Sequence, residues 1–161
     1  VKFNTANPFT LRDPDAGITY GVTAGALAVN GAAIPAPANG WYRLDADVNA
    51  LTFATSAYEI GLVGSATPNQ WNSPDQKMDY DAATGTWSIT IDLVEGEIKF
   101  RLNDSWAWNL GYNKNNTGIL TDLFHDGDNI KVTPGNYTIT LTITQPNGPT
   151  EAGSCTIVKN N

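Results

Sequence analysis

Apolar and polar side chains alternate in short runs along most of this chain, and the alternation restricts its fold more than any other feature. The runs "TWSITIDL" (86–93) and "EIKFRLN" (97–103) each place an apolar residue at every second position. A period of two is that of a β-strand with one face toward a core. Gly96 between the runs suits a tight turn, so the two are predicted to form a β-hairpin.

Further stretches show the same strand pattern: "YEIGLVGSA" (58–66), "NIKVT" (129–133), "NYTITLTI" (136–143) and "GSCTIV" (153–158). Glycine and proline separate them, and no window of helical length carries a sustained apolar period of 3.6 residues. Short strands at this spacing are typical of two packed antiparallel sheets. The sequence therefore predicts an all-β chain built on an immunoglobulin-like β-sandwich.

The chain also repeats itself. "KFNTANPF" (2–9) is similar to "KFRLNDSW" (99–106), and "GAAIPAPANGWYRLDADV" (31–48) is similar to "GDNIKVTPGNYTITLTI" (127–143). The register holds between the copies with small changes in loop length. The first copy has no counterpart of residues 57–98, and it has Phe9 where the second copy has Trp106.

This repeat predicts the domain organisation. Residues 1–56 are interpreted as the C-terminal part of a truncated module, and residues 57–161 as one complete module. Half a sandwich exposes a sheet face and unpaired strand edges, so we expect residues 1–56 to be weakly stable by themselves.

Charge and composition exclude several classes of function. The net charge is −7 and the nine basic residues are scattered, whereas a nucleic-acid binder concentrates positive charge against phosphate. A single cysteine, Cys155, excludes a disulfide within the chain, and a single histidine excludes a multi-histidine zinc site. We therefore predict no nucleic-acid partner, no metal and no cofactor.

Catalysis is not expected either. Hydrolysis of a glycosidic bond requires two carboxyl groups facing each other across a cleft. The acidic residues between positions 79 and 97 fall on solvent-facing strand positions or in turns. Nothing in the pattern pairs two of them, and the sequence therefore predicts that the protein is not an enzyme.

Three stretches carry a resemblance to a known family: "IGLVGSATPNQW" (60–71), "GTWSITIDLVEGEIKFRLNDSWAWNLG" (85–111) and "GDNIKVTPGNYTITLTI" (127–143). They resemble the repeating modules of the SusE/SusF family, which are starch-binding lipoproteins of the bacterial cell surface. The pattern is also similar to starch-binding modules attached to some pullulanases. The resemblance implies an immunoglobulin-like module, no catalysis and an α-glucan ligand.

The same resemblance implies a location and partners. Members of the family lie at the outer membrane, held by a lipid anchor, and take part in polysaccharide utilisation together with other components of a surface glycan-uptake complex. No apolar run in this chain has the length of a membrane-spanning helix. Contact with a membrane is therefore expected only through a lipid anchor that this chain does not contain.

Tryptophans are the first candidates for binding a neutral sugar, because the apolar faces of sugar rings stack on aromatic planes. Trp71 lies in the polar loop "SATPNQWNSPDQ" (65–76), and Trp106 and Trp108 stand two positions apart. In an extended strand such a pair points to opposite faces. Continued alternation from Leu102 turns Trp106 toward the core, unless the "NDS" turn breaks the phase, so both tryptophans remain candidates.

Polar residues near these tryptophans complete the predicted site. Lys99 and Arg101 share the strand face that is turned away from the core, where they either reach sugar hydroxyls or form plain solvated surface. Asn109 and Tyr112 extend the same polar rim.

The sequence predicts a non-catalytic module that binds polysaccharide, with starch or another α-1,4-glucan as the expected ligand. Two alternatives stay open. The module is a structural spacer whose tryptophans are buried, or it binds a different glycan.

Overall fold

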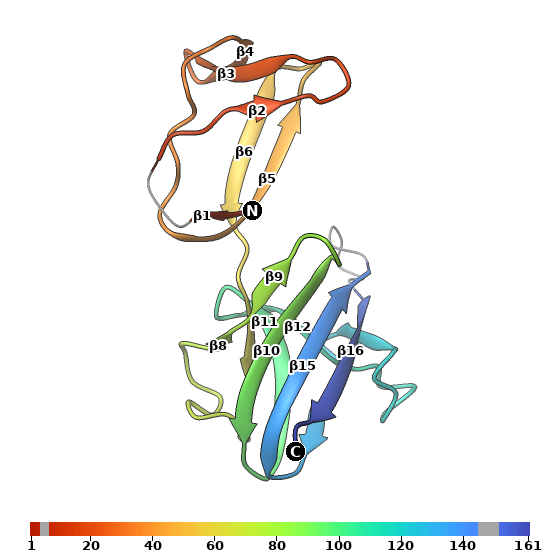
Figure 1. The fold of residues 1–161 in the computed structure, drawn as a ribbon. Coiled ribbons are helices and arrows are strands. Elements are labelled where there is room, and N and C mark those ends of the chain that lie inside the picture. The colour runs from red at the N-terminus through yellow and green to blue at the C-terminus, as the bar shows by residue number, and fades with distance from the viewer. Residues whose placement is uncertain (4–6, 145–151) are drawn as a thin grey trace. The chain divides into compact units, whose positions relative to one another are not determined.

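The computed structural model describes residues 1–3, 7–144 and 152–161. Throughout these ranges the regular structure is β-strand without helix, which confirms the predicted all-β class (Figure 1). In the same ranges no helix is long and apolar enough to cross a membrane. The chain divides into two compact units, Val1–Tyr58 (unit 1) and Glu59–Asn161 (unit 2). That each is a copy of one module stays a prediction.

Unit 1 contains two small antiparallel sheets. One has the strand order β1 (Lys2–Phe3), β5 (Gly40–Asp47), β6 (Thr52–Ala57), and the other has the order β2 (Leu11–Arg12), β3 (Thr19–Thr23), β4 (Ala26–Val29). The buried core consists of Tyr20, Leu27 and Ile34, with Phe9 and Phe53 among the half-buried residues around it. A core of this size buries little apolar surface, and the weak stability of residues 1–56 by themselves stays a prediction.

Unit 2 contains one long, folded-over antiparallel sheet with the strand order β8-β7-β11-β12-β13-β16-β15-β10-β9, and β14 pairs with β11. The strand bounds are β7 (Ile60–Val63), β8 (Gln76–Lys77), β9 (Asp79–Asp81), β10 (Thr86–Leu93), β11 (Gly96–Leu102), β12 (Ser105–Tyr112), β13 (Leu123–His125), β14 (Ile130–Val132), β15 (Gly135–Ile143) and β16 (Ala152–Lys159). The result is sandwich-like, with β10 and β15 passing in front of β11 and β12 in Figure 1.

The core of unit 2 follows the alternation of the sequence. Ile98 and Phe100 of β11 are fully buried, as are Ile139 and Leu141 of β15. Trp87 of β10 and Cys155 of β16, which lie on the inward faces that the alternation predicts, are also buried. Burial raises the pKa of the Cys155 thiol to about 12.

The predicted hairpin between residues 86–93 and 97–103 is wrong. β10 pairs with β15 and β9, whereas β11 pairs with β7, β12 and β14. The alternation identifies which side chains face inward but does not identify the neighbouring strand. Gly96 has a different role, because a Cβ atom there would lie 2.7 Å from the Ser65 hydroxyl oxygen and 2.9 Å from the backbone nitrogen of Ala66.

A true hairpin joins β11 to β12. Its turn residues, Asn103 and Asp104, both have left-handed backbone angles, with φ of 52° and 57°. Two such residues in succession are typical of the tight turn that suits the twist of a hairpin. Leu102 pairs with Ser105, but Arg101 pairs with Asn109, so residues 106–108 are accommodated as a bulge in β12.

Candidate functional site

Trp71 and Trp106 lie against each other on the surface of unit 2, and we call them the indole pair. Their ring centroids are 6.0 Å apart and their planes are inclined by 40°. Trp106 is 47% exposed, and Trp71 is half-buried. The pair joins two segments far apart in sequence, because Trp71 comes from the loop between β7 and β8 and Trp106 from the start of β12.

The direction of Trp106 follows from the hairpin turn. Leu102 and Ser105 are directly opposite across β11 and β12, so their side chains share one face. The next residue, Trp106, then projects to the other face, which is that of Arg101. The expectation that alternation continues through the turn and directs Trp106 to the core is wrong. The two turn residues break the phase, which is the other possibility that the sequence left open.

Trp108 has a different environment. It is half-buried, and its Nε1 atom is buried without a hydrogen-bond partner among the described residues. It lies in the bulge of residues 106–108, where the strict alternation of an extended strand does not hold. Of the two tryptophans that the sequence left undecided, Trp106 is the one that contacts Trp71.

Arg101 lies under the indole pair. Its Cζ atom is 4.7 Å from the centroid of the Trp106 ring, a distance at which a cation is attracted to an aromatic face. Only 2% of the residue is exposed. The structure therefore places Arg101 on the predicted face but beneath an aromatic ring, and not on solvated surface.

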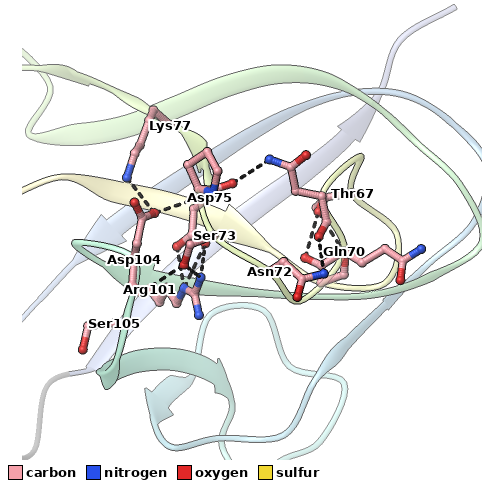
Figure 2. A network of polar contacts seen from close by, with 12 residues as sticks. Thr67, Gln70, Asn72, Ser73, Asp75, Lys77, Arg101, Asp104 and Ser105 are labelled. Carbon is pink, nitrogen blue, oxygen red and sulfur yellow. Dashed lines mark hydrogen bonds and ion pairs between the residues drawn. The ribbon is translucent and has the colours of Figure 1, made fainter.

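The guanidinium of Arg101 is held by Asp75 and Ser73 (Figure 2). Nε donates to Asp75 Oδ2 at 2.7 Å, and Nη2 donates to Asp75 Oδ1 at 2.6 Å and to the Ser73 hydroxyl at 2.8 Å. The Asp75 side chain has no exposed surface. Burial raises the pKa of Asp75, and the hydrogen bonds and charge of Arg101 oppose that rise.

Gly61 makes room for this ion pair. It is directly opposite Arg101 in the pairing of β7 with β11. A Cβ atom at Gly61 would lie 2.4 Å from the Cβ atom of Asp75, closer than two such atoms can approach. The glycine is therefore required by close packing, and its absence of a side chain lets a buried carboxylate reach Arg101.

Asp104 connects the hairpin turn to the loop that carries Trp71. Its Oδ1 atom accepts hydrogen bonds from Lys77 Nζ at 2.7 Å and from the backbone N–H of Asp75 at 2.8 Å (Figure 2). Burial by itself raises the pKa of Asp104, but these two hydrogen bonds and the positive charges of Lys77 and Arg101 together outweigh it and hold the pKa below its usual value. The contact fixes the two segments that supply the indole pair.

Lys99 and Asn109 lie on the same face as Arg101. Lys99 is 9% exposed, and burial lowers the pKa of its ammonium group, while the charge of Asp126 opposes that shift. Asn109 is buried and donates from Nδ2 to Asp126 Oδ1 at 2.6 Å. Its Oδ1 atom is buried and has no hydrogen-bond partner in the described part of the chain.

Tyr112 is not brought to the indole pair. It lines a separate groove of about 600 Å³ together with residues that include Glu97, Val132 and Tyr137, and neither Trp71 nor Trp106 is among the lining residues. Burial raises the pKa of Tyr112. The structure thus gathers Trp71, Trp106, Arg101, Lys99 and Asn109 on one face and separates Tyr112 from them.

Sequence reasoning missed Asp75, Ser73 and Asp104. No signal in the sequence marked them, because alternation puts Arg101 on the face turned away from the core, where a charged residue needs no buried partner. Among the described residues no group of three histidine, cysteine, aspartate or glutamate side chains is arranged to hold a metal ion.

Comparison with known proteins adds no family to this geometry, because no model of a protein family matches the chain and no curated protein sequence matches it.

Proposed function

We propose that unit 2 is a non-catalytic carbohydrate-binding module and that the indole pair is its binding surface. The observation that carries the proposal is an exposed tryptophan, Trp106, inclined by 40° to Trp71 on top of a buried ion pair. An exposed aromatic residue that continues into a second, half-buried one forms an apolar surface, and such surfaces on proteins often mark ligand or partner contacts.

A neutral polysaccharide fits this surface. Sugar rings present apolar C–H faces that stack on indoles, and two inclined rings follow a curved polymer better than two parallel rings. The protein carries a net charge of −7, which gives no attraction for an anionic ligand. α-1,4-Glucan is a curved, neutral polymer and is also the ligand that the SusE/SusF resemblance implies.

Arg101 supports the indole pair from below. Within the described residues its guanidinium binds Asp75 and Ser73 and packs on the Trp106 ring, and its burial keeps it from a sugar on the outer side of the indoles. We assign it the role of holding Trp106 in a fixed orientation, which reduces the entropy lost when a ligand binds. Lys99 and Asn109 lie on the same face and are buried as well, so we assign them to the support of the indole pair and not to direct contact with sugar hydroxyls.

A structural spacer is the second candidate. It requires buried tryptophans, and Trp87 and the half-buried Trp108 fit that description while Trp106 does not. The proposed location is the outer membrane surface, in a complex that takes up glycan, and this part of the proposal rests on the SusE/SusF resemblance alone.

The test is titration of the 161-residue protein with maltoheptaose, followed by tryptophan fluorescence, together with migration in a native gel that contains starch. We expect a change in emission and retardation in the gel. Trp106→Ala should weaken binding by about 30-fold, the effect of removing a central aromatic contact of about 2 kcal/mol.

Phe124→Ala is the matched control. Phe124 is an exposed aromatic residue of β13 in the same unit, with 39% of its surface exposed, and it is not part of the indole pair. The control variant should bind like the wild type. Absence of both the emission change and the retardation would overturn the glucan proposal, and retardation by another polysaccharide alone would assign a different glycan.

A further inference from the structure

An open cleft lies in the loop that carries Trp71. It has a volume of about 380 Å³ and is lined by Pro68, Asn69, Gln70, Asn72, Ser73 and Pro74. This volume falls within the range of small-molecule sites, which begins at about 300 Å³. The lining differs from that of the indole pair, because it is formed by amides, a hydroxyl and prolines and contains no aromatic ring.

The amide groups of the cleft have unused hydrogen-bonding capacity. Asn69 donates from Nδ2 to the carbonyl oxygen of Pro74 at 2.8 Å, and Asn72 donates from Nδ2 to the carbonyl oxygen of Asn69 at 3.3 Å. Within the described ranges, the Oδ1 atoms of these two residues and the whole side-chain amide of Gln70 form no hydrogen bond. An amide both donates and accepts, as a sugar hydroxyl does.

The loop is held in one conformation by its own hydrogen bonds. The Thr67 hydroxyl shares its single proton between the carbonyl oxygens of Gly64 at 3.0 Å and Gln70 at 3.2 Å (Figure 2). The backbone N–H of Gly64 donates to the Gln70 carbonyl oxygen at 2.9 Å. Gln70 itself has a left-handed backbone with φ of 53°. The backbone that carries the amides is thus fixed before any ligand arrives, which lowers the cost of binding.

The cleft shares one residue, Ser73, with the hydrogen bonds of the ion pair beneath Trp106. Trp71 stands between Gln70 and Asn72, which both line the cleft. Ser73 also lines the cleft, and its hydroxyl accepts a hydrogen bond from the Arg101 guanidinium at 2.8 Å. The cleft and Trp71 are thus built from the same short loop, and the Ser73 contact connects that loop to Arg101.

We propose that this cleft is an additional sugar subsite, which binds by hydrogen bonds the glucose unit next to those stacked on the indole pair. The inference rests on the proposed glucan-binding function and deepens it. A ligand short enough to fit on the indoles gains nothing from the cleft, whereas a longer one engages both. The site then distinguishes glucans by length.

The test measures the affinities of maltotriose and maltoheptaose by calorimetry for the full 161-residue chain. The wild type should bind maltoheptaose more tightly than maltotriose. In the double variant Gln70→Ala with Asn72→Ala, the affinity for maltoheptaose should fall about tenfold, the loss expected for two modest hydrogen bonds. The affinity for maltotriose should stay within about twofold.

Two further variants control for folding and for amides elsewhere. Gln70→Ala alone removes a side chain without hydrogen bonds in the described structure and should give part of the same loss. Asn115→Ala removes an exposed amide outside the cleft and should leave both affinities unchanged. A thermal melt of each variant shows whether the loop still folds.

The outcomes separate this inference from the function on which it rests. An unchanged maltoheptaose affinity in the double variant overturns the subsite while leaving glucan binding intact. Equal losses for both ligands, with an unchanged melting temperature, also overturn it, because the amides then serve the indole pair itself. Wild-type protein that binds neither ligand overturns the proposed function, and the subsite with it.

Discussion

The two units contain aromatic clusters with opposite surroundings. In unit 1, Phe9 lies 5.1 Å from Phe3, and Phe3 lies 5.7 Å from Tyr42, each measured between ring centroids. Phe9 packs against the buried core of that unit. In unit 2, Trp106, which occupies the position that the repeat aligns with Phe9, packs on the guanidinium of Arg101 and is 47% exposed.

The difference teaches what keeps an aromatic residue on a surface. A ring that rests on apolar neighbours is drawn into the core by the hydrophobic effect. A ring that rests on a buried, charged group gains attraction on its inner face and leaves its outer face free. The ion pair of Arg101 and Asp75 is therefore the feature of unit 2 that the comparison should test first.

Removing the carboxylate of Asp75 should have the largest effect on the stability of the protein. Asp75→Ala leaves the Arg101 guanidinium buried and unpaired, and we expect it to lower the free energy of unfolding by about 3–5 kcal/mol, measured by urea denaturation. The matched change in unit 1 is Asp45→Ala. It breaks the Arg43–Asp45 pair, whose side chains are 38% and 54% exposed, and should cost less than about 1 kcal/mol. Similar losses from both variants would contradict the structural role of the buried pair.

Filling the space that Gly61 leaves for the ion pair should have the second-largest effect on stability. Gly61→Ala places a methyl group against Asp75, and such overpacking should lower the free energy of unfolding by about 1–3 kcal/mol. In unit 1, Gly17 has open space around it but a left-handed backbone, with φ of 69°, so Gly17→Ala should cost about 1–2 kcal/mol for the backbone alone. The two variants should differ in glucan binding, because only Gly61 lies next to the ion pair that supports Trp106. Only Gly61→Ala should therefore weaken retardation in a starch gel.

The aromatic residues themselves distinguish the two clusters. Phe9→Ala should lower the free energy of unfolding by about 2 kcal/mol, because the ring packs against a core. Trp106→Ala should lower it by about 1 kcal/mol or less, because the outer face of the ring is in water. Chemical denaturation of both variants checks this. A larger stability loss for Trp106→Ala would show that its main role is structural.

The smallest expected effect is the loss of stability at low pH that results from protonation of Asp104. The folded-state pKa of Asp104 is lowered, so its contribution to stability is fully present above the unfolded pKa. That contribution is lost as the pH falls through the folded pKa. The urea midpoint of Asp104→Asn should therefore fall less than that of the wild type between pH 7 and pH 3. Asp47 of unit 1 also has a lowered pKa, caused by backbone hydrogen bonds from Ala50 and Asn49. The lowered pKa of Asp104 comes partly from the charge of Lys77, whereas that of Asp47 comes from backbone hydrogen bonds. Added salt should therefore weaken the contribution of Asp104 to stability and leave that of Asp47 unchanged.

The sequence predicted the strands and their inward faces well, because each depends on local alternation. Most residues of β10, β11 and β15 that the alternation assigned to the core are buried, while Ile89, Ile91 and Leu102 are half-buried. The pairing of β10 with β15 could not be predicted, because it joins residues more than 40 positions apart and any strand with one apolar face suits either sheet. The false hairpin of residues 86–103 followed from that limit.

In the candidate site, too, the local features were predicted and the long-range contacts were not. The loop position of Trp71 and the outward face of Lys99 and Arg101 were predicted, since they depend on composition and on a period of two. The contact of Trp71 with Trp106 and the burial of Arg101 by Asp75 depend on how a loop folds back over a strand. Tyr112 was assigned to the wrong neighbourhood for the same reason, because proximity in sequence to Asn109 does not place it on the same face.

The buried cysteine gives a practical readout for all of these comparisons. Cys155 is the only cysteine in the chain and lies in β16 of unit 2, with its pKa raised to about 12 by burial. Alkylating reagents attack the thiolate, so labelling of the native state must wait for β16 to open. The rate of labelling by iodoacetamide, followed by mass spectrometry, therefore reports the opening of unit 2 while unit 1 contributes no signal.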